Sequence, residues 1–272
     1  MRFAFQGEPG AFSEAAAARL DPSAAAVPCR EFEDVFAAVR SGSASHGVLP
    51  IENSVGGSIH RNYDLLSEHE LPIVGEVELR VEHTLAALPG VSIDEIRRVY
   101  SHPQALAQCE RFLRSLKDVD IVATYDTAGS ARMIREGNLR ETAAIASRRA
   151  VEIFGLEVLR DGVQDFDSNI TRFIVIAREP LPLGTPDKTS LVFALPNTPG
   201  ALFKALSVFA LRDIDLAKLE SRPLRGRPWE YLFYVDLNAS REEPRCARAI
   251  EHLEEFATFV RVLGSYARWR EG

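Results

Sequence analysis

The feature that most constrains this chain is an alternation of short apolar runs with helical patterns. Runs such as FAFQ, AAVPC and GVLPIE are each followed by an amphipathic stretch, and the rhythm resumes after residue 97 with a helix expected over residues 105–116. Strands that alternate with helices indicate a mainly parallel α/β sheet. The run IVGEVELRVEHTLAAL, residues 73–88, places two strand-like pieces in succession. We expect it to cross between two α/β lobes, with a small-molecule cleft between them.

A stretch rich in proline and glycine divides the chain. EPLPLGTPD, residues 179–187, lies between two strand-like runs and is predicted to be a linker. Beyond it the pattern reads strand, helix, strand, strand, helix, strand, which is the ferredoxin-like βαββαβ order. The first of these helices is expected to start at Pro199, with Thr198 as its cap.

Composition excludes several classes of protein. A net charge of -7 and the lack of any Lys/Arg run oppose binding to nucleic acid. No stretch approaches the roughly 20 apolar residues that span a bilayer. The cysteines, Cys29, Cys109 and Cys246, lie far apart and are expected to be small buried thiols in a reducing compartment. Because the first residues also lack a signal-like pattern, the sequence predicts a cytoplasmic protein without nucleic-acid or membrane partners.

Familiar metal and cofactor motifs are missing from the sequence. No GxGxxG follows a strand and no GxxxxGK[ST] occurs. The six histidines include no HxxxH pair, so surface or capping roles are expected for them rather than metal ligation. Lys117 is the only lysine before Lys188, and it lies in the surface-like SLKDVD, which argues against Schiff-base chemistry. We therefore expect neither a metal nor a cofactor.

Four polar segments remain as candidates for chemistry, at positions where open α/β sheets bind ligands. They are GEPGAFS (7–13), PIENSVGGS (50–58), SHPQALAQ (101–108) and DGVQDFDSNITRF (161–173). Tight turns and helix capping would each explain some of them equally well. Together they offer amides, hydroxyls and carboxylates but no strong nucleophile. Such a site can orient a small anion and hydrogen-bond a leaving group, so it suits a substrate that carries its own driving force.

The motifs PIENSVGG, SHPQALAQC and DSNITRF, followed in order by PGALF and ESRP, resemble those of prephenate dehydratase with a C-terminal ACT domain. The resemblance covers essentially the whole chain and departs at Ala217, where serine or threonine is usual. It implies a catalytic domain over residues 1–178 that resembles type 2 periplasmic binding proteins. Its first lobe would cover about 1–75 and 160–178, and its second about 80–159. The linker, 179–187, would lead to an ACT regulatory domain over 188–272.

The resemblance implies a carbon–oxygen lyase of L-phenylalanine biosynthesis, which converts prephenate to phenylpyruvate, carbon dioxide and water. Prephenate is one fragmentation away from a benzene ring, so no cofactor is required. Thr171 is assigned the hydrogen bond or proton relay to the departing hydroxyl. The residues assigned to hold the substrate are Glu52, Asn53, Ser101 and Gln108. Alternation along the strand directs Arg172 away from Thr171, into a structural ion pair.

The resemblance also implies feedback by L-phenylalanine through the ACT domain. The residues expected to form this effector pocket are Asn197, Gly200, Ala201, Leu202, Glu220, Ser221 and Arg222. Because ACT domains commonly pair their sheets side by side, a homodimer or homotetramer is expected. The alternative is that the domain only builds the oligomer.

Three other functions remain open. Arogenate dehydratase catalyses the same reaction on a substrate with an amine in place of the keto group. The lack of a transit-like extension weighs against its plastid form. A two-lobed solute-binding protein without catalysis rests on fold analogy alone. An ACT-linked transcription regulator is opposed by the acidic charge of the chain.

Overall fold

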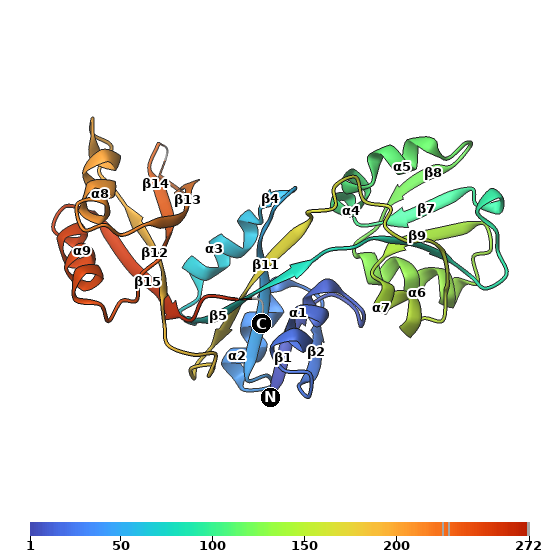
Figure 1. Ribbon diagram of the computed structural model, residues 1–272, viewed down its shortest axis with the longest axis horizontal. Helices are drawn as coiled ribbons and strands as arrows, with labels where there is room; N and C mark the ends of the chain where they lie inside the picture. Colours follow the sequence, from blue (N-terminus) through green and yellow to red (C-terminus); the bar gives the residue numbers. More distant parts are fainter. Residues whose placement is uncertain (225, 228, 271–272) are drawn as a thin grey trace. The chain divides into compact units, whose positions relative to one another are not determined.

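The computed structural model describes residues 1–224, 226, 227 and 229–270 (Figure 1). The chain forms two compact units, one of Met1–Asn62 with Val77–Phe173 and the other of Tyr63–Glu76 with Ile174–Gly272. Compactness therefore groups residues 63–76 with the C-terminal part of the chain. The boundaries of the lobes, linker and regulatory domain remain predictions.

The first sheet has the strand order β2-β1-β3-β11-β5, with the short β4 on β3. Its strands are β1 (Arg2–Gln6), β2 (Ala25–Cys29), β3 (His46–Asn53), β4 (Gly57–Ser58), β5 (Ile73–Arg80) and β11 (Ile170–Ala177). The helices between them are α1 (Phe12–Leu20), α2 (Phe32–Ser41) and α3 (His60–Glu68). Strand β1 pairs in parallel with β2 and β3, as the alternation predicts. Helix α2 buries Val35, Phe36 and Val39, the apolar face of its pattern.

The second sheet lies wholly in the first unit and has the order β10-β6-β9-β7-β8. Its strands are β6 (Thr84–Ala87), β7 (Arg98–Ser101), β8 (Asp120–Ala123), β9 (Thr142–Ala146) and β10 (Glu157–Arg160). Strand β7 is parallel to β8 and β9, but β6 runs antiparallel to both β9 and β10. The prediction of a mainly parallel sheet is therefore wrong here. The cause is β6, which enters directly from the strand β5 without a crossover helix.

The helices of the second sheet include one that differs from the sequence pattern. They are the 3₁₀ turn η1 (Ile93–Glu95), α4 (Pro103–Gln108), α5 (Glu110–Ser115), α6 (Thr127–Gly137) and α7 (Arg148–Ile153). The single helix expected over residues 105–116 is broken at Cys109, whose backbone has φ -119° and ψ 22°. The break leaves the carbonyl of Gln108 free to accept a hydrogen bond from the amide of Asp165 at 2.7 Å. It thereby ties α4 to the segment that precedes Thr171.

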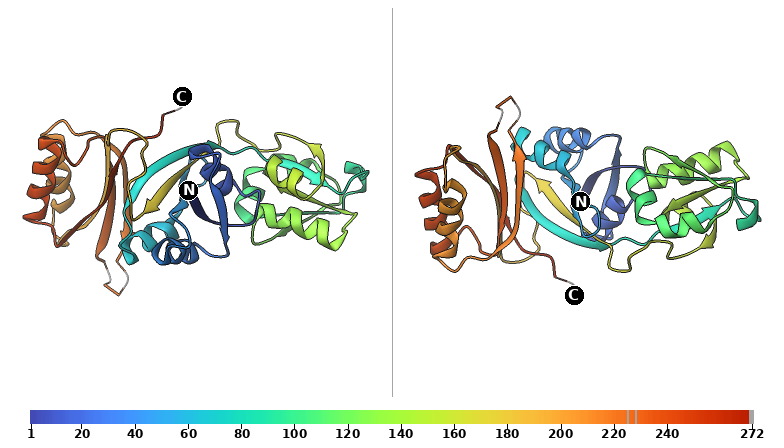
Figure 2. Two further views of the ribbon diagram at one scale, coloured as in Figure 1. Left: turned by 90° about the horizontal axis from the view of Figure 1, so that it is seen from below. Right: turned by 90° about the horizontal axis from the view of Figure 1, so that it is seen from above.

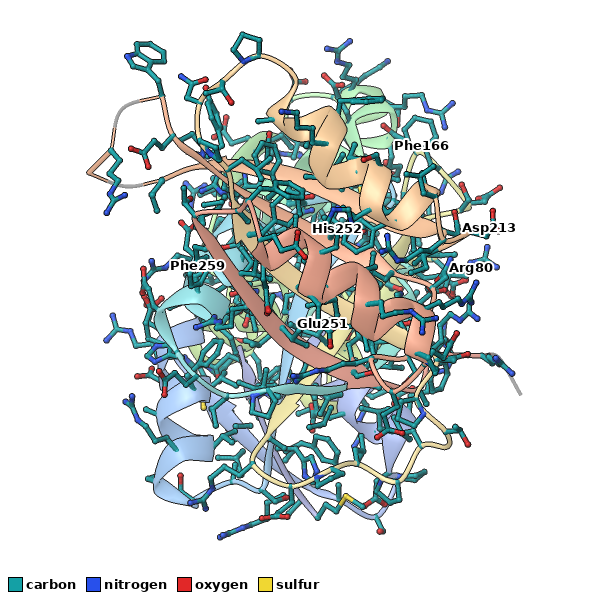
Figure 3. All side chains as sticks on the ribbon, turned by 90° about the vertical axis from the view of Figure 1, so that its left-hand side faces the viewer. Arg80, Phe166, Asp213, Glu251, His252 and Phe259 are labelled. Carbon is teal, nitrogen blue, oxygen red and sulfur yellow. The ribbon has the colours of Figure 1, made fainter. Side chains whose placement is uncertain are left out.

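The third sheet belongs to the second unit and has the predicted βαββαβ order. Its elements are β12 (Lys188–Ala194), α8 (Ala201–Ala210), β13 (Leu216–Pro223), β14 (Tyr231–Leu237), α9 (Pro244–Glu254) and β15 (Phe259–Tyr266). The strands form an antiparallel sheet in the order β13-β14-β12-β15, and both helices cover one face of it (Figures 1 and 2). Figure 3 shows Glu251 and His252 on α9, and Phe259 at the start of β15.

Helix α8 starts two residues later than predicted. Gly200, in the left-handed conformation at φ 77°, is its N-cap, and the first helical residue is Ala201. The amide of Ala201 donates to the carbonyl of Thr198 at 3.2 Å. Thr198 thus contributes its carbonyl to a turn, and its hydroxyl does not cap the helix.

Helix α3 supplies polar contacts to the other face of the third sheet, within the second unit. Arg222 pairs with Asp64 at 3.3 Å, and the hydroxyl of Tyr234 donates to the carbonyl of Tyr63 at 3.0 Å. Tyr234 faces away from its neighbours in β14, whose side chains join the core under α8 and α9. This face of the sheet is therefore occupied by residues of α3.

A buried ion pair is the other polar feature of the second unit. The ammonium of Lys188 lies 2.8 and 3.0 Å from the two carboxylate oxygens of Glu76. The side chains of Lys188 and Glu76 are 6% and 2% exposed. The amide of Trp269 also donates to Glu76 at 3.2 Å. Each charge is thus satisfied inside the protein.

Cys109 and Cys246 are buried as expected, whereas Cys29 is half-buried. Burial raises the pKa of the Cys109 thiol to about 12, and the carboxylate of Asp165 adds to the effect. Among the described residues, no helix has the length and apolar character needed to cross a membrane.

Candidate functional site

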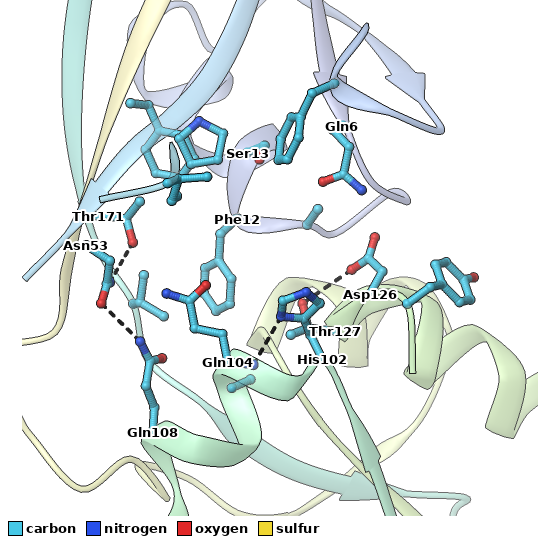
Figure 4. Close-up of a pocket in the computed structure, with 18 of the residues that line it drawn as sticks. Gln6, Phe12, Ser13, Asn53, His102, Gln104, Gln108, Asp126, Thr127 and Thr171 are labelled. Atoms are coloured by element: carbon cyan, nitrogen blue, oxygen red, sulfur yellow. Dashed lines mark hydrogen bonds between the residues drawn. The ribbon is translucent and has the colours of Figure 1, made fainter. Parts of the chain in front are cut away.

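A pocket of about 470 Å³ lies within the first unit. Its walls come from the ends of β1 and β3, the starts of β11, α1 and α2, the helix α4 and the turn before α6 (Figure 4). Figure 4 shows Thr171, Asn53 and Gln108 together at one end, and Asp126 and Thr127 away from them. The lining thus joins residues from all four polar stretches predicted from the sequence with residues outside them, among them Asp126 and Thr127.

The side chain of Asn53 has its direction fixed by the main chain. Its Oδ1 accepts hydrogen bonds from the amides of Val55 and Gly56 at 3.0 and 2.7 Å. Because a backbone N–H can only donate, the oxygen of Asn53 must be on that side. Its Nδ2 therefore faces Thr171 and donates to the hydroxyl oxygen at 2.9 Å.

The orientation of Asn53 also fixes which atoms donate and accept in the neighbouring buried side-chain amides. Gln108 donates from Nε2 to Oδ1 of Asn53 at 3.0 Å, so its own Oε1 is an acceptor. That oxygen receives Nδ2 of Asn169 at 3.0 Å, and Asn169 in turn accepts from Asn53 at 2.7 Å. Asn53, Gln108 and Asn169 are buried. Every amide in the ring is satisfied, which makes the network rigid.

His83 completes the network and has a determined tautomer. Its Nε2 lies 2.8 Å from Oε1 of Gln108, which can only accept, so Nε2 carries the proton. Burial lowers the pKa of His83, and the hydrogen bond that His83 donates to Gln108 opposes this only in part. His83 is therefore neutral at neutral pH. Its Nδ1 is buried and has no partner among the described residues.

The network leaves the hydroxyl proton of Thr171 available. Thr171 accepts from Asn53, and none of the hydrogen bonds in the described part of the chain uses its hydroxyl as a donor. Thr171 is 7% exposed and lines the pocket. A largely buried donor in the wall of a pocket, with its acceptor side already occupied, can bind an oxygen that develops negative charge.

Three further donors belong to residues that line the pocket. The amides of Phe12 and Ser13 begin α1, and neither has a partner among the described residues, so they are free to bind a carboxylate. His102 caps α4 by accepting from the amide of Gln104 at 3.2 Å through Nδ1, which leaves the proton on Nε2. Burial lowers the pKa of His102 although the carboxylate of Asp126 opposes this, so it is a neutral donor. Its predicted capping role is confirmed.

Two of the residues assigned to the substrate lie outside the lining of this pocket. Ser101 is fully buried and donates its hydroxyl to the carbonyl of Ile145 at 2.6 Å. Glu52 lies one residue before Asn53 on β3 and forms an ion pair with Arg172 at 3.8 Å. The ion pair predicted for Arg172 is therefore confirmed. Thr171, Asn53 and Gln108 are brought together as expected.

The residues assigned to the effector lie on two faces of the third sheet. Ser221 pairs with Phe233, on the face that α8 and α9 cover, whereas Glu220 pairs with Tyr234 on the α3 face. Arg222 faces α3 and is engaged by Asp64. The remaining four residues surround the start of α8, and they are Asn197, Gly200, Ala201 and Leu202.

Comparison with known proteins identifies the family. A model described as prephenate dehydratase matches residues 3–181. The chain is also 54% identical over 283 residues to "Arogenate dehydratase/prephenate dehydratase 6, chloroplastic" of Arabidopsis thaliana, covering 98% of this chain and 68% of that protein. The chain belongs to the prephenate dehydratase family. It spans about two thirds of the length of that relative.

Solved structures agree with this family. A prephenate dehydratase from Arthrobacter aurescens, in complex with L-Phe, is 35% identical with a TM-score of 0.89 and covers 98% of this chain and 90% of that chain. A protein described as "a novel type of quorum quenching acylases" is 39% identical with a TM-score of 0.89, covering 99% and 98%. These likenesses confirm the predicted α/β fold with a two-lobed catalytic part. The prephenate dehydratase family also confirms the predicted enzyme class, a dehydratase and hence a lyase.

The comparisons correct one prediction. The expectation of a cytoplasmic protein is wrong, because relatives at 52–54% identity are named chloroplastic. That expectation rested on the first residues and the scattered cysteines, neither of which reports where a folded domain works.

Sequence patterns missed several residues of the pocket and of the hydrogen-bond network beside it. His83 was expected at the surface or at a cap but is 2% exposed inside the network. Asn169 lies within DSNITRF and was not singled out. Asp126 lies in TYDTAG, where an aspartate before a helical pattern is a capping signal, and it caps α6 in the structure.

Proposed function

We propose that this chain is an arogenate dehydratase, which converts arogenate to phenylalanine, carbon dioxide and water, and accepts prephenate as a poorer substrate. The observation that carries the dehydratase chemistry is the free hydroxyl proton of Thr171, set by the donation from Asn53 at 2.9 Å. The preference for arogenate is supported by the names of several relatives, among them arogenate dehydratases of Petunia hybrida and Arabidopsis thaliana. Relatives named chloroplastic support work in a plastid.

The proposed reaction breaks two bonds of the substrate ring. The electron pair of the bond to the ring carboxylate enters the ring as carbon dioxide leaves, and the pair of the opposite carbon–oxygen bond leaves with the hydroxide. Thr171 stabilises the charge that develops on this oxygen by donating a hydrogen bond, and the hydroxide takes up a proton to become water. A threonine hydroxyl is too weak an acid to be the sole proton source at neutral pH, so its main contribution is positioning and charge stabilisation.

The remaining donors suit the carboxylates of the substrate. The free amides of Phe12 and Ser13 at the start of α1, together with Nε2 of His102, supply neutral hydrogen-bond donors. Together these donors hold the ring with the hydroxyl toward Thr171. Asn53 and Gln108 then act by orienting Thr171. We assign Glu52 and Ser101 to support of β3 and β7.

The test is an assay of the purified chain with arogenate and prephenate in parallel. Phenylalanine release from arogenate and phenylpyruvate release from prephenate are followed by chromatography. We expect a higher kcat/KM for arogenate. A higher value for prephenate would reverse the substrate assignment, and turnover of neither would remove the dehydratase function. Because one similar structure is described as an acylase, hydrolysis of an N-acyl amide is measured in the same series. Hydrolysis without dehydration would replace the proposal.

We also propose that the second unit binds phenylalanine and pairs with a second copy of the chain, as a dimer or a dimer of dimers. Support comes from the βαββαβ order and from the L-Phe complex of the similar Arthrobacter protein. The exposed loop of Asn197 and the start of α8, with Gly200 at φ 77°, offer backbone donors. Added phenylalanine should then raise the melting temperature and change turnover. Unchanged values for both would exclude this regulation.

A further inference from the structure

The charge of the pocket favours a substrate with a cationic group. Its described lining includes two carboxylates, Glu31 and Asp126, and neither lysine nor arginine. The two histidines, His83 and His102, have pKa values lowered by burial and stay neutral near pH 7. Prephenate carries two carboxylates and no cation, whereas arogenate carries the same carboxylates and an ammonium. A pocket with negative walls therefore disfavours prephenate more than arogenate.

Asp126 is a buried carboxylate with no cation beside it. It is 8% exposed, and its oxygens accept from the amides of Glu8 and Ala128, each at 2.9 Å. Among the described residues, no lysine, arginine or histidine forms an ion pair with Asp126. Arg132 is near in sequence, but it pairs with Glu8 at 3.0 Å and donates to Tyr125. Aspartate is seldom this buried without a charged partner, and its two oxygens retain further lone pairs.

The position of Asp126 matches the position of the amino group. In arogenate the departing hydroxyl and the amino-acid side chain are attached to opposite corners of the ring. When the hydroxyl lies at Thr171, the side chain must point to the other end of the pocket. Figure 4 shows Asp126 and Thr127 at that end, away from Thr171, Asn53 and Gln108. An ammonium there would meet the carboxylate of Asp126.

Glu31 does not provide the same interaction. Its side chain is 67% exposed, and it caps α2 in a reciprocal arrangement with Asp34. Water and salt screen an exposed charge of this kind, so its effect on a bound ligand is small. The two carboxylates of the pocket are therefore a natural pair for comparison, one buried and one exposed.

We propose that Asp126 is the specificity-determining residue of this site and selects the amino substrate by pairing with its ammonium group. The inference rests on the proposed dehydratase function. With a keto group in that position, the carboxylate would face an oxygen acceptor and no donor, so the same contact that attracts arogenate repels prephenate. Selectivity thus comes from attraction and repulsion at one residue.

The test is the variant Asp126→Asn, which removes the charge and keeps a residue that caps helices well. We expect the ratio of kcat/KM for arogenate to kcat/KM for prephenate to fall roughly 10- to 100-fold, the usual effect of losing a buried charge-assisted hydrogen bond. The matched variant Glu31→Gln should change this ratio by no more than about threefold. Melting curves verify that both variants fold. If Asp126→Asn does not fold, Asp126→Ser, another capping residue, replaces it.

The outcomes separate this inference from the proposed function. If the wild-type chain turns over neither substrate, the dehydratase function itself fails. If it turns over both, and Asp126→Asn lowers the two kcat/KM values equally, Asp126 only holds the loop at Glu8 and the inference is wrong. An equal change of the ratio in Glu31→Gln would also overturn it, because the selectivity would then come from the overall charge of the pocket.

Discussion

Two buried polar clusters in this chain are built in opposite ways. The cluster around Thr171 consists of neutral amides and a neutral histidine, joined by hydrogen bonds of 2.7 to 3.0 Å. The cluster in the second unit consists of full charges, with Lys188 and Glu76 held at 2.8 Å. The first is in the unit that contains the pocket, and the second is in the other unit.

The two clusters differ in the hydrogen-bonding groups that they leave available to a ligand. An ion pair satisfies both partners, so Lys188 and Glu76 present nothing to a ligand. A chain of amides has a direction, because every donor must meet an acceptor, and its last member is left with a defined role. In this protein the last member is Thr171, left as a donor. The charged cluster is therefore closed to a ligand, whereas the directed neutral cluster leaves one hydrogen-bond donor available.

The largest expected effect tests the charged cluster. Lys188→Met leaves the carboxylate of Glu76 buried without its cation and should lower the free energy of unfolding by about 3–5 kcal/mol. Urea denaturation measures this loss. The double variant Lys188→Met with Glu76→Leu removes both charges and should recover most of the stability. A single variant as stable as the wild type would mean that the pair contributes little.

The next effect tests the neutral cluster. Thr171→Val keeps the shape of the side chain but removes the hydroxyl, so turnover should fall by about 10²–10³-fold. The melting temperature should change little, because Nδ2 of Asn53 keeps its bond to Asn169. Steady-state kinetics with arogenate measure the loss, and Thr171→Ser should restore part of it. If Thr171→Val works as fast as the wild type, the comparison between the clusters fails.

The smallest expected effect also tests the neutral cluster, through the pH dependence of the free energy of unfolding. His83 has its pKa lowered from 6.5 by burial, so the unfolded chain binds more protons below that pH than the folded chain. The contribution of neutral His83 to the free energy of unfolding is complete above pH 6.5, the pKa in the unfolded chain. It is lost as the pH falls through the lower pKa of the folded chain. His83→Gln should reduce the slope of unfolding free energy against pH in this range by up to about 1.4 kcal/mol per unit. His46 and His102, whose pKa values are also lowered by burial, add to the slope with the same sign. An unchanged slope would place the titration elsewhere.

Much of the fold could be predicted because its signals are local. The alternation of apolar runs depends on neighbours in the sequence, and so does the βαββαβ order. Strand β10 and the break at Cys109 could not be predicted, because each depends on a distant partner. Strand β10 forms against β6, and the break serves the bond from Asp165 to Gln108.

The residues of the candidate site also divide into those with a local sequence signal and those that depend on distant partners. Thr171, Asn53 and Gln108 stand in recognisable motifs, and the structure brings them together. His83 has no local signal, since its burial depends on the partner Gln108 and on Phe12, whose ring meets it edge-on at 5.5 Å. Ser101 shows the converse, because its motif suggests a ligand while its hydroxyl is used by the carbonyl of Ile145. A motif names the residue type, and only the fold decides which atoms remain available.

The two main-chain donors beside Asn53 have a consequence for how the site can vary. Nearly every residue type has a main-chain N–H. The exposed side chain of Val55 can therefore be replaced without losing the hydrogen bond from the amide of residue 55 to Asn53. Gly56 is less free, because an added methyl group would meet the end of Gln104. Proline is the one replacement at position 55 that would remove the donor itself. The orientation of Asn53, and through it that of Thr171, is thus set by main-chain N–H groups that most substitutions leave unchanged.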